Sequence, residues 1–243
     1  MKMKFQKGML LLAAAMALPG VSMAQDKVEA SVGADLVSGY IWRGQDLGGV
    51  SIQPSASVSY KGFSLSGWGS VGFDKEDTKE FDLCLGYSYK GFSVSVTDYW
   101  FNQGVSSKTG EDLSGNYFHY GSYSTSHVFE AQIGYDFGPV AVNWYTNFAG
   151  NDGLNDDGDR AYSSYFCVSA PFKLGGIDWT AEVGAVPWAT TFYADVNGFA
   201  VTNVSLGASK EIKITDSFSL PLFATATWNP ATEGAYFAVG LSF

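Results

Sequence analysis

Hydrophobic and polar residues alternate with a period of two along most of this chain. In residues 50–60 apolar side chains occupy every second position, and Ser or Gln fills each position between them. Successive side chains of a strand point to opposite faces, so each such segment has one apolar and one polar face. The pattern predicts strands at residues 28–42, 50–60, 63–73, 80–89, 92–101, 127–136, 140–148, 161–172, 177–187, 200–212, 218–228 and 235–243.

The connections between these strands alternate strictly between short and long. The short ones are residues 61–62, 90–91, 137–139, 173–176 and 213–217, and the long ones are 43–49, 74–79, 102–126, 149–160, 188–199 and 229–234. Outer-membrane β-barrels have short periplasmic turns, longer extracellular loops and an even number of strands. The sequence therefore predicts an all-β fold, a closed antiparallel transmembrane β-barrel of about 12 strands.

Outward-facing aromatic residues form two groups along the predicted strands, one at each membrane interface. The periplasmic group is Tyr60, Phe63, Tyr87, Tyr89, Phe92, Tyr135, Phe172, Trp179, Phe218 and Phe243. The extracellular group is Trp42, Phe73, Phe81, Trp100, Phe129, Phe148, Tyr162, Trp228 and Phe237, and Tyr40 shares the face of Trp42 in the first strand. A soluble sandwich gives no reason for such sorting, because its aromatics serve a single core.

The last predicted strand ends on an aromatic residue, Phe243. This ending resembles the C-terminal signal by which barrel-assembly machinery recognises outer-membrane β-barrels. With an even strand number, we expect residues 235–243 to close the barrel against residues 28–42, with Phe243 near Val28.

The first 24 residues predict a secretory signal peptide. Lys2, Lys4 and Lys7 precede a short apolar run and the small-residue site Ser22, Met23 and Ala24. Residues 25–243 then form one barrel domain in the outer membrane of a Gram-negative bacterium. Removing the three lysines lowers the 14 Lys and Arg residues to 11, against 24 Asp and Glu. Such an acidic chain is not expected to bind nucleic acid, which requires a basic surface.

Strand parity predicts a polar, acidic lumen. The expected lining residues are Glu29, Asp35, Arg43, Gln53, Glu80, Asp82, Glu130, Gln132, Asn143, Asp178 and Glu182, with Arg160 a further candidate. An isolated buried charge is costly, so we expect Arg43 to pair with Glu80, Asp82 or Glu130. An acid-lined bore favours cations. We therefore expect a porin or diffusion channel for small hydrophilic solutes, although the same charges could instead hold a plugged interior together.

Four residues carry expectations of their own. Parity turns Asp98 toward lipid, so we expect a bulge or a place at the rim. Pro54 lacks a ladder donor and predicts a bulge or a local weakness. Cys84 and Cys167 lie on the inward face of distant strands, which favours two buried free thiols over a disulfide.

Other functions remain open from the sequence. The loop at residues 102–126 carries an aromatic cluster that could bind a partner or glycan, or fold into the lumen: Tyr117, Phe118, Tyr120 and Tyr123. A non-conducting structural or adhesion barrel is therefore the main alternative. An enzyme at the rim is less favoured, because Ser126 and His127 are adjacent and point apart in a strand. We expect no cofactor and no resident metal, although the acidic loop at 149–160 leaves Ca²⁺ open.

Residues 38–44, with the sequence SGYIWRG, resemble the N-terminal signature of the TorF family of porin-like outer-membrane proteins. Residues 66–70 and 80–87 are similar to the third strand and the E-x-D strand of that family, and Glu130 stands where the family often has an acid. Family members commonly continue with a Ser-Gln pair after this signature, whereas Gln45, Asp46 and Leu47 follow here. The resemblance implies an outer-membrane barrel and no particular substrate.

Overall fold

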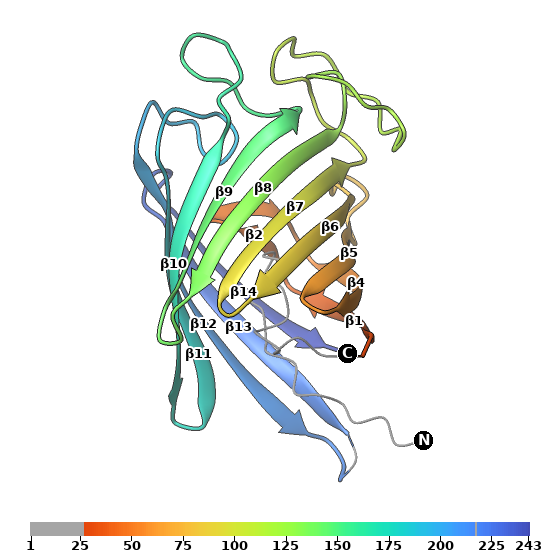
Figure 1. Ribbon diagram of the computed structural model, residues 1–243, viewed down its shortest axis with the longest axis vertical. Helices are drawn as coiled ribbons and strands as arrows, with labels where there is room; N and C mark the ends of the chain where they lie inside the picture. Colours follow the sequence, from red (N-terminus) through yellow and green to blue (C-terminus); the bar gives the residue numbers. More distant parts are fainter. Residues whose placement is uncertain (1–26, 217) are drawn as a thin grey trace.

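The computed structural model describes residues 27–216 and 218–243, which form a closed antiparallel barrel (Figure 1). Twelve strands make its wall: β1 (Glu29–Val37), β4 (Ser51–Tyr60), β5 (Phe63–Gly72), β6 (Glu80–Tyr89), β7 (Phe92–Phe101), β8 (His127–Asp136), β9 (Ala141–Gly150), β10 (Ser164–Leu174), β11 (Ile177–Val186), β12 (Ala200–Lys213), β13 (Ser219–Asn229) and β14 (Gly234–Ser242). Two short strands, β2 (Tyr40–Trp42) and β3 (Gln45–Gly48), form a separate hairpin. The expected signal peptide, residues 1–24, lies outside the described residues.

Each wall strand pairs with its neighbour in the chain, and β1 closes the barrel against β14. Short turns join the strands at one end, here the turn end, and longer loops join them at the other, the loop end (Figure 1). Two of the tight turns are built from Lys followed by Gly, and both residues have positive φ: 49° and 86° at Lys61 and Gly62. This conformation matches the twist of antiparallel strands. The predicted barrel and its alternation of turns and loops are confirmed.

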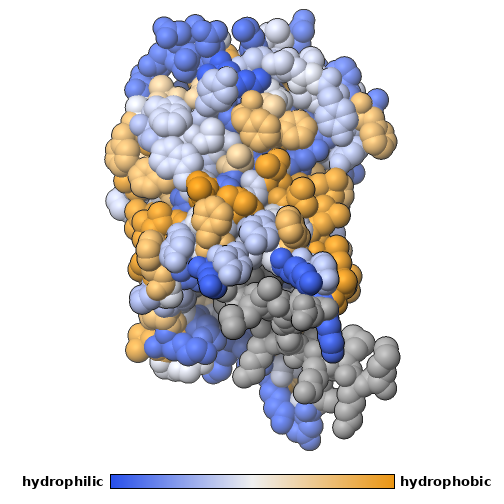
Figure 2. Space-filling model, in the orientation of Figure 1, coloured by the Kyte–Doolittle hydropathy of each residue, from blue (hydrophilic) through white to orange (hydrophobic). Residues whose placement is uncertain are grey.

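The outer surface of the wall is apolar, and the inner surface is polar or small. On β6, Leu85 is 60% exposed while Cys84 beside it is 1% exposed. A band of apolar residues crosses the middle of the visible face, with polar residues at both ends (Figure 2). Within the described part of the chain, no helix is long and apolar enough to cross a bilayer. The period-two pattern thus separates an inward from an outward set of side chains.

The expected first strand, residues 28–42, is wrong in its second half. β1 ends at Val37, and the chain then turns inward, so that β2 and β3 cross the interior as a hairpin (Figure 1). Tyr40 and Trp42 are therefore buried, at 5% and 7% exposure, and do not belong to the aromatic group at the loop end. The alternation of apolar and polar residues does not reveal the inward turn after Val37, because side chains alternate between two faces both in a wall strand and in a hairpin inside the lumen.

The closure between β1 and β14 is confirmed, but its register differs from the expectation. Phe243 exchanges backbone hydrogen bonds with Ala34, at 2.9 and 3.2 Å, and does not lie opposite Val28. The strands of a barrel tilt, and the hydrogen-bond register shifts around the circumference. The first and last strands therefore meet with an offset that a count of strands cannot supply.

The structure also answers the expectations about Pro54 and about the two cysteines. Pro54 lies opposite Ala34 of β1, but β4 has no partner positions on β5 at Gln53 and Pro54. The register continues unchanged on either side, so Pro54 produces a local weakness and no bulge. Cys84 and Cys167 are free and buried, as expected.

Candidate functional site

The hairpin of β2 and β3 carries the candidate site at its tip. Arg43 and Gly44 form the turn with φ of 49° and 84°, the same conformation as the Lys-Gly turns of the wall. A Cβ on Gly44 would overlap the backbone carbonyl of Thr202 on β12. The Asn229 side chain on β13 donates to the Gly44 carbonyl at 3.0 Å. Only glycine therefore fits where the tip docks against the inner wall.

The turn presents Arg43 to Glu130 on β8, on the far side of the lumen. The guanidinium makes two parallel bonds to this carboxylate, Nη1–Oε2 at 2.5 Å and Nη2–Oε1 at 3.0 Å. Tyr193 accepts from Arg43 at 2.7 Å and donates to Glu130 at 2.8 Å. Tyr99 donates to the other carboxylate oxygen at 2.9 Å. Of the three acids expected to pair with Arg43, the structure selects Glu130, and the predicted pairing is confirmed.

Aromatic rings surround the Arg43 guanidinium on its remaining sides. Its central carbon lies 3.9 Å from the Tyr145 ring centre, 4.4 Å from Trp42 and 4.9 Å from Tyr165. Ring faces attract a cation, and more strongly when water is excluded. The Arg43 and Glu130 side chains are only 6% and 2% exposed. Both charges are thus paired and hydrogen-bonded, which a buried ion pair needs to persist.

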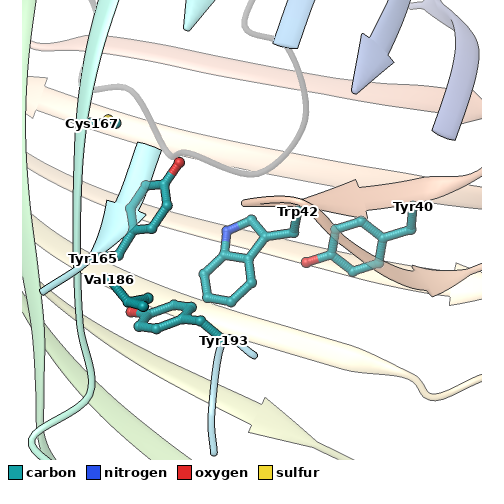
Figure 3. Close-up of a cluster of buried hydrophobic side chains, with 6 residues drawn as sticks. All are labelled: Tyr40, Trp42, Tyr165, Cys167, Val186 and Tyr193. Atoms are coloured by element: carbon teal, nitrogen blue, oxygen red, sulfur yellow. The ribbon is translucent and has the colours of Figure 1, made fainter. Parts of the chain in front are cut away.

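The aromatic contacts extend from the hairpin to the wall. Tyr40, Trp42, Tyr165, Cys167, Val186 and Tyr193 form one buried cluster (Figure 3). Trp42 packs on Tyr193 with ring centres 5.7 Å apart, and Tyr40 packs on Trp68 at 5.4 Å. Tyr193 comes from the loop after β11, residues 187–199, which also reaches inward. Burial raises the pKa of the Tyr193 phenol well above its ordinary value, so it remains a neutral donor to Glu130.

The acids expected in the lumen do face inward, and most of them lack a cation. Glu80 and Asp82 are buried on β6, and the Tyr40 hydroxyl bonds to Glu80. Glu182 accepts from Asn203 at 2.8 Å and Tyr165 at 3.1 Å. Among the described residues, Arg43 is the only buried Lys or Arg. Among the described residues, the interior therefore holds more acidic than basic side chains, and its one buried arginine belongs to the hairpin.

The remaining expected lining residues lie away from the cluster around Arg43, and not all of them line the lumen. Gln132 donates to Asn143 at 2.9 Å and to Ser93 at 3.0 Å. The structure therefore brings together Gln132 and Asn143, which were both expected to line the lumen. Gln53 is buried beside Ser51. Glu29 and Asp35 are half-buried on β1, apart from the cluster around Arg43. Asp178 and Arg160 do not line the lumen. Asp178 pairs with the exposed Lys173 at 2.7 Å, and Arg160 contacts Tyr123 and Gly150 among the loops.

Sequence reasoning missed the aromatic part of the site. Tyr99, Tyr145, Tyr165 and Tyr193 were not expected to line the lumen. Strand parity allows an inward position for Tyr99, Tyr145 and Tyr165, and Tyr193 lies in a predicted loop, but no pattern indicates that the four meet at one arginine. The turn itself had a signal: Arg43 and Gly44 repeat the cation-glycine order of the two tight Lys-Gly turns. That order would have indicated a hairpin tip within residues 38–49.

Asp98 does face outward, and the pairing of β7 is continuous, so the expected bulge is absent. The side chain lies near the loop end of the strand, where it bonds to the first residue of β8. His127 Nδ1 lies 2.7 Å from the Asp98 carboxylate, and Nε2 lies 2.6 Å from the Tyr117 carbonyl oxygen. Each ring nitrogen of His127 therefore has an oxygen atom within hydrogen-bond distance. The Tyr117 and Tyr120 rings pack on His127, with centres 5.2 and 4.5 Å away. The loop at 102–126 therefore covers a polar pair on the outside of the barrel.

The four aromatic residues of the loop at 102–126 lie in different places and do not form one continuous surface. Tyr117 and Tyr120 lie against the wall, whereas Tyr123 stacks on Arg160, whose guanidinium carbon is 4.6 Å from the ring centre. Phe118 is 82% exposed. The loop also reaches the barrel mouth, where it borders a cavity of about 230 Å³ together with residues near Asn151 and Phe192.

The candidates for chemistry at the rim have structural partners. Ser126 donates its hydroxyl to the Ser114 carbonyl at 2.9 Å, on the opposite face from the His127 ring. In the acidic loop, Asp152 accepts from Asn147 at 3.1 Å and from the Gly153 amide at 2.7 Å. Among the described residues, no group of three His, Cys, Asp or Glu converges as metal ligands would.

Comparison with known proteins adds no relative. The chain matches no model of a known protein family, and no curated protein matches it.

Proposed function

We propose that this chain is an outer-membrane diffusion channel for small hydrophilic solutes, that it prefers cations, and that the hairpin of β2 and β3 closes it. The closed barrel supports this proposal, because its outward face is apolar at mid-height and its inward face is polar. A barrel of twelve strands is wide enough for a bore once its interior is not filled by side chains. The proposal assigns the chain no chemical reaction.

One observation carries the proposal: the Arg43 side chain that crosses the lumen to Glu130 belongs to a hairpin and not to a wall strand. Arg43 reaches Glu130 from the tip of a hairpin whose chain joins the wall strands at residues 38–39 and 49–50. A wall residue could not be withdrawn without breaking the barrel, whereas a hairpin can move as one piece. The acids Glu80, Asp82 and Glu182 would then line an aqueous path, which favours cations.

Conductance of the purified protein in planar bilayers tests the proposal. We expect the wild type to give rare current steps, and Arg43→Ala to raise the open fraction at least about ten-fold, because loss of a buried pair costs about 3–5 kcal/mol. Arg160→Ala is the matched control, since Arg160 contacts Ser122 and Gly150 outside the hairpin. Its open fraction should equal that of the wild type.

A second function has its own observation. Phe118 is 82% exposed on a loop that is otherwise anchored to the wall, as an adhesion surface would require. No current from the wild type or from Arg43→Ala at any voltage would reject the channel and leave this non-conducting barrel. In either case we propose that Phe243, at the end of the closing strand, is the residue read by the barrel-assembly machinery.

A further inference from the structure

The hairpin of β2 and β3 continues the β1–β4 pair in the same register. Val37 of β1 lies opposite Ser51 of β4, and three residues further along each strand Tyr40 lies opposite Gly48. A one-residue irregularity follows between Tyr40 and Ile41. The segment from Glu29 to Tyr60 is therefore a single long hairpin whose tip has bent out of the wall and into the lumen.

The bend occurs at glycines that the present conformation does not require. Gly39 and Gly49 flank the bend, and neither has a positive φ. A Cβ on Gly49 would meet nothing within 4 Å, and one on Gly39 would meet only the Gly48 carbonyl oxygen at 3.8 Å. Neither sterics nor dihedral angles explain these residues in the observed position. Their remaining physical effect is backbone freedom at the two points where the hairpin joins the wall.

The bend leaves one edge of β14 without a partner. β14 pairs with β13 along its length, from Gly234 opposite Asn229 to Leu241 opposite Leu222. On its other side it pairs with β1 only where the two strands overlap near the turn end, up to Ser38 and Val239. Within residues 27–216 and 218–243, no strand pairs with the β1 side of residues 234–238. Unpaired backbone groups at a barrel wall are costly in lipid.

We propose that the free edge at residues 234–238 is a docking site for residues 39–43, so that the hairpin has a second position in the wall. Val37 lies opposite Gly240, and the same register places Ile41 opposite Tyr236 and Arg43 opposite Gly234. The five residues that left the wall thus match the five that lack a partner. This inference concerns the hairpin alone and holds whether or not the barrel conducts ions.

The side chains of the hairpin suit both positions. In the wall, continued alternation turns Tyr40 and Trp42 outward and Arg43 inward. Trp42 would then lie beside Ala235, which is paired in turn with the exposed Trp228. An aromatic row of this kind is typical of the interface at the end of a membrane strand. Movement of the hairpin into the wall would break the ion pair of Arg43 and Glu130. Because water would then fill the lumen and solvate both charges, the free-energy cost of breaking the pair would be lower than in a dry interior.

The two positions have opposite effects on the barrel. With the hairpin inside, the lumen is blocked and the wall has an unpaired edge between β1 and β14. With the hairpin in the wall, the edge is paired and the lumen is cleared. One movement therefore opens the axial path and seals the side of the barrel.

Disulfide trapping in the folded, full-length protein tests the second position. Cys84 and Cys167 are first replaced by Ala, and the pair Ile41→Cys with Tyr236→Cys is then oxidised with copper phenanthroline. A disulfide needs Cα atoms within about 7 Å, which the wall register provides for this pair because it places Ile41 directly opposite Tyr236. We expect it to form at least several-fold faster than Ile41→Cys with Ala238→Cys, which lies on the same face but two residues out of register. Adding Glu130→Gln should accelerate the 41–236 disulfide further, because it removes the carboxylate that binds Arg43 in the lumen.

The lumen position supplies the opposite control. Trp42→Cys with Tyr193→Cys joins two residues whose rings are in contact inside the barrel. Complete linkage of this pair, with the 41–236 pair no faster than the out-of-register pair, would overturn the inference. Linkage is scored by mass in the fraction that shows the mobility of a folded barrel, so that misfolded variants do not contribute. The readout involves no current, so its result is separate from that of the bilayer experiment.

Discussion

At the scale of single residues, the lumen is organised by one carboxylate. Among the described residues, Glu130 accepts from Arg43, Tyr99 and Tyr193, and so joins the hairpin, the wall and the loop after β11. Removing one donor from a buried charged acceptor costs more than removing a neutral bond. The Tyr193 hydroxyl is the most informative donor, because it also accepts from Arg43.

Tyr193→Phe keeps the ring and removes this hydroxyl. We expect the free energy of unfolding to fall by about 1.5–3 kcal/mol, the range for a hydrogen bond to a charged group. Urea unfolding in lipid vesicles measures the change. Tyr145→Phe is the matched control, since its ring lies 3.9 Å from the Arg43 guanidinium carbon while its contact with Arg43 is through the ring face. Equal losses in the two variants would contradict the assignment.

At the scale of elements, alternation predicts strands well but not where a strand lies. It located all twelve wall strands, because an apolar outer face and a polar inner face impose the period on each. It failed at Tyr40 and Trp42, since a hairpin inside the lumen alternates in the same way. That Arg43 pairs with an inward acid was predictable, because a buried charge needs a partner, but the sequence left Glu80, Asp82 and Glu130 open. The tyrosines around it were not, because their meeting depends on the inward path of two separate loops.

The loop at 102–126 gives a prediction at this scale. Asp98→Asn removes the charge that faces His127 beneath Tyr117, so the loop should leave the wall more often. We expect chymotrypsin to cut after Tyr117 at least about ten-fold faster, because cleavage follows the population of the open form. Asp112→Asn removes an exposed acid from the same loop and should leave the rate unchanged. Equal cleavage of Asp98→Asn and the wild type would show that the contact between Asp98 and His127 does not hold the loop.

At the scale of the whole molecule, charge is distributed unevenly between wall and hairpin. The wall contributes Glu80, Asp82 and Glu182 to the interior, while the hairpin contributes Arg43. Moving the hairpin into the wall would therefore both clear the bore and leave its acids unbalanced by a nearby cation. A field of one sign within a narrow path concentrates counter-ions.

Ion selectivity should therefore depend on the acids of β6. In the Arg43→Ala background, Glu80→Gln combined with Asp82→Asn should lower the K⁺ to Cl⁻ permeability ratio by about five-fold. This corresponds to about 1 kcal/mol, the attraction of two unit charges 4 Å apart in water. Reversal potentials in a salt gradient measure the ratio, and Asp156→Asn with Asp157→Asn, in the exposed loop at 149–160, controls for total charge. The effect should shrink as ionic strength rises, because salt screens charges across an open bore. A ratio that falls equally in the loop variant would place selectivity at the mouth and not on β6.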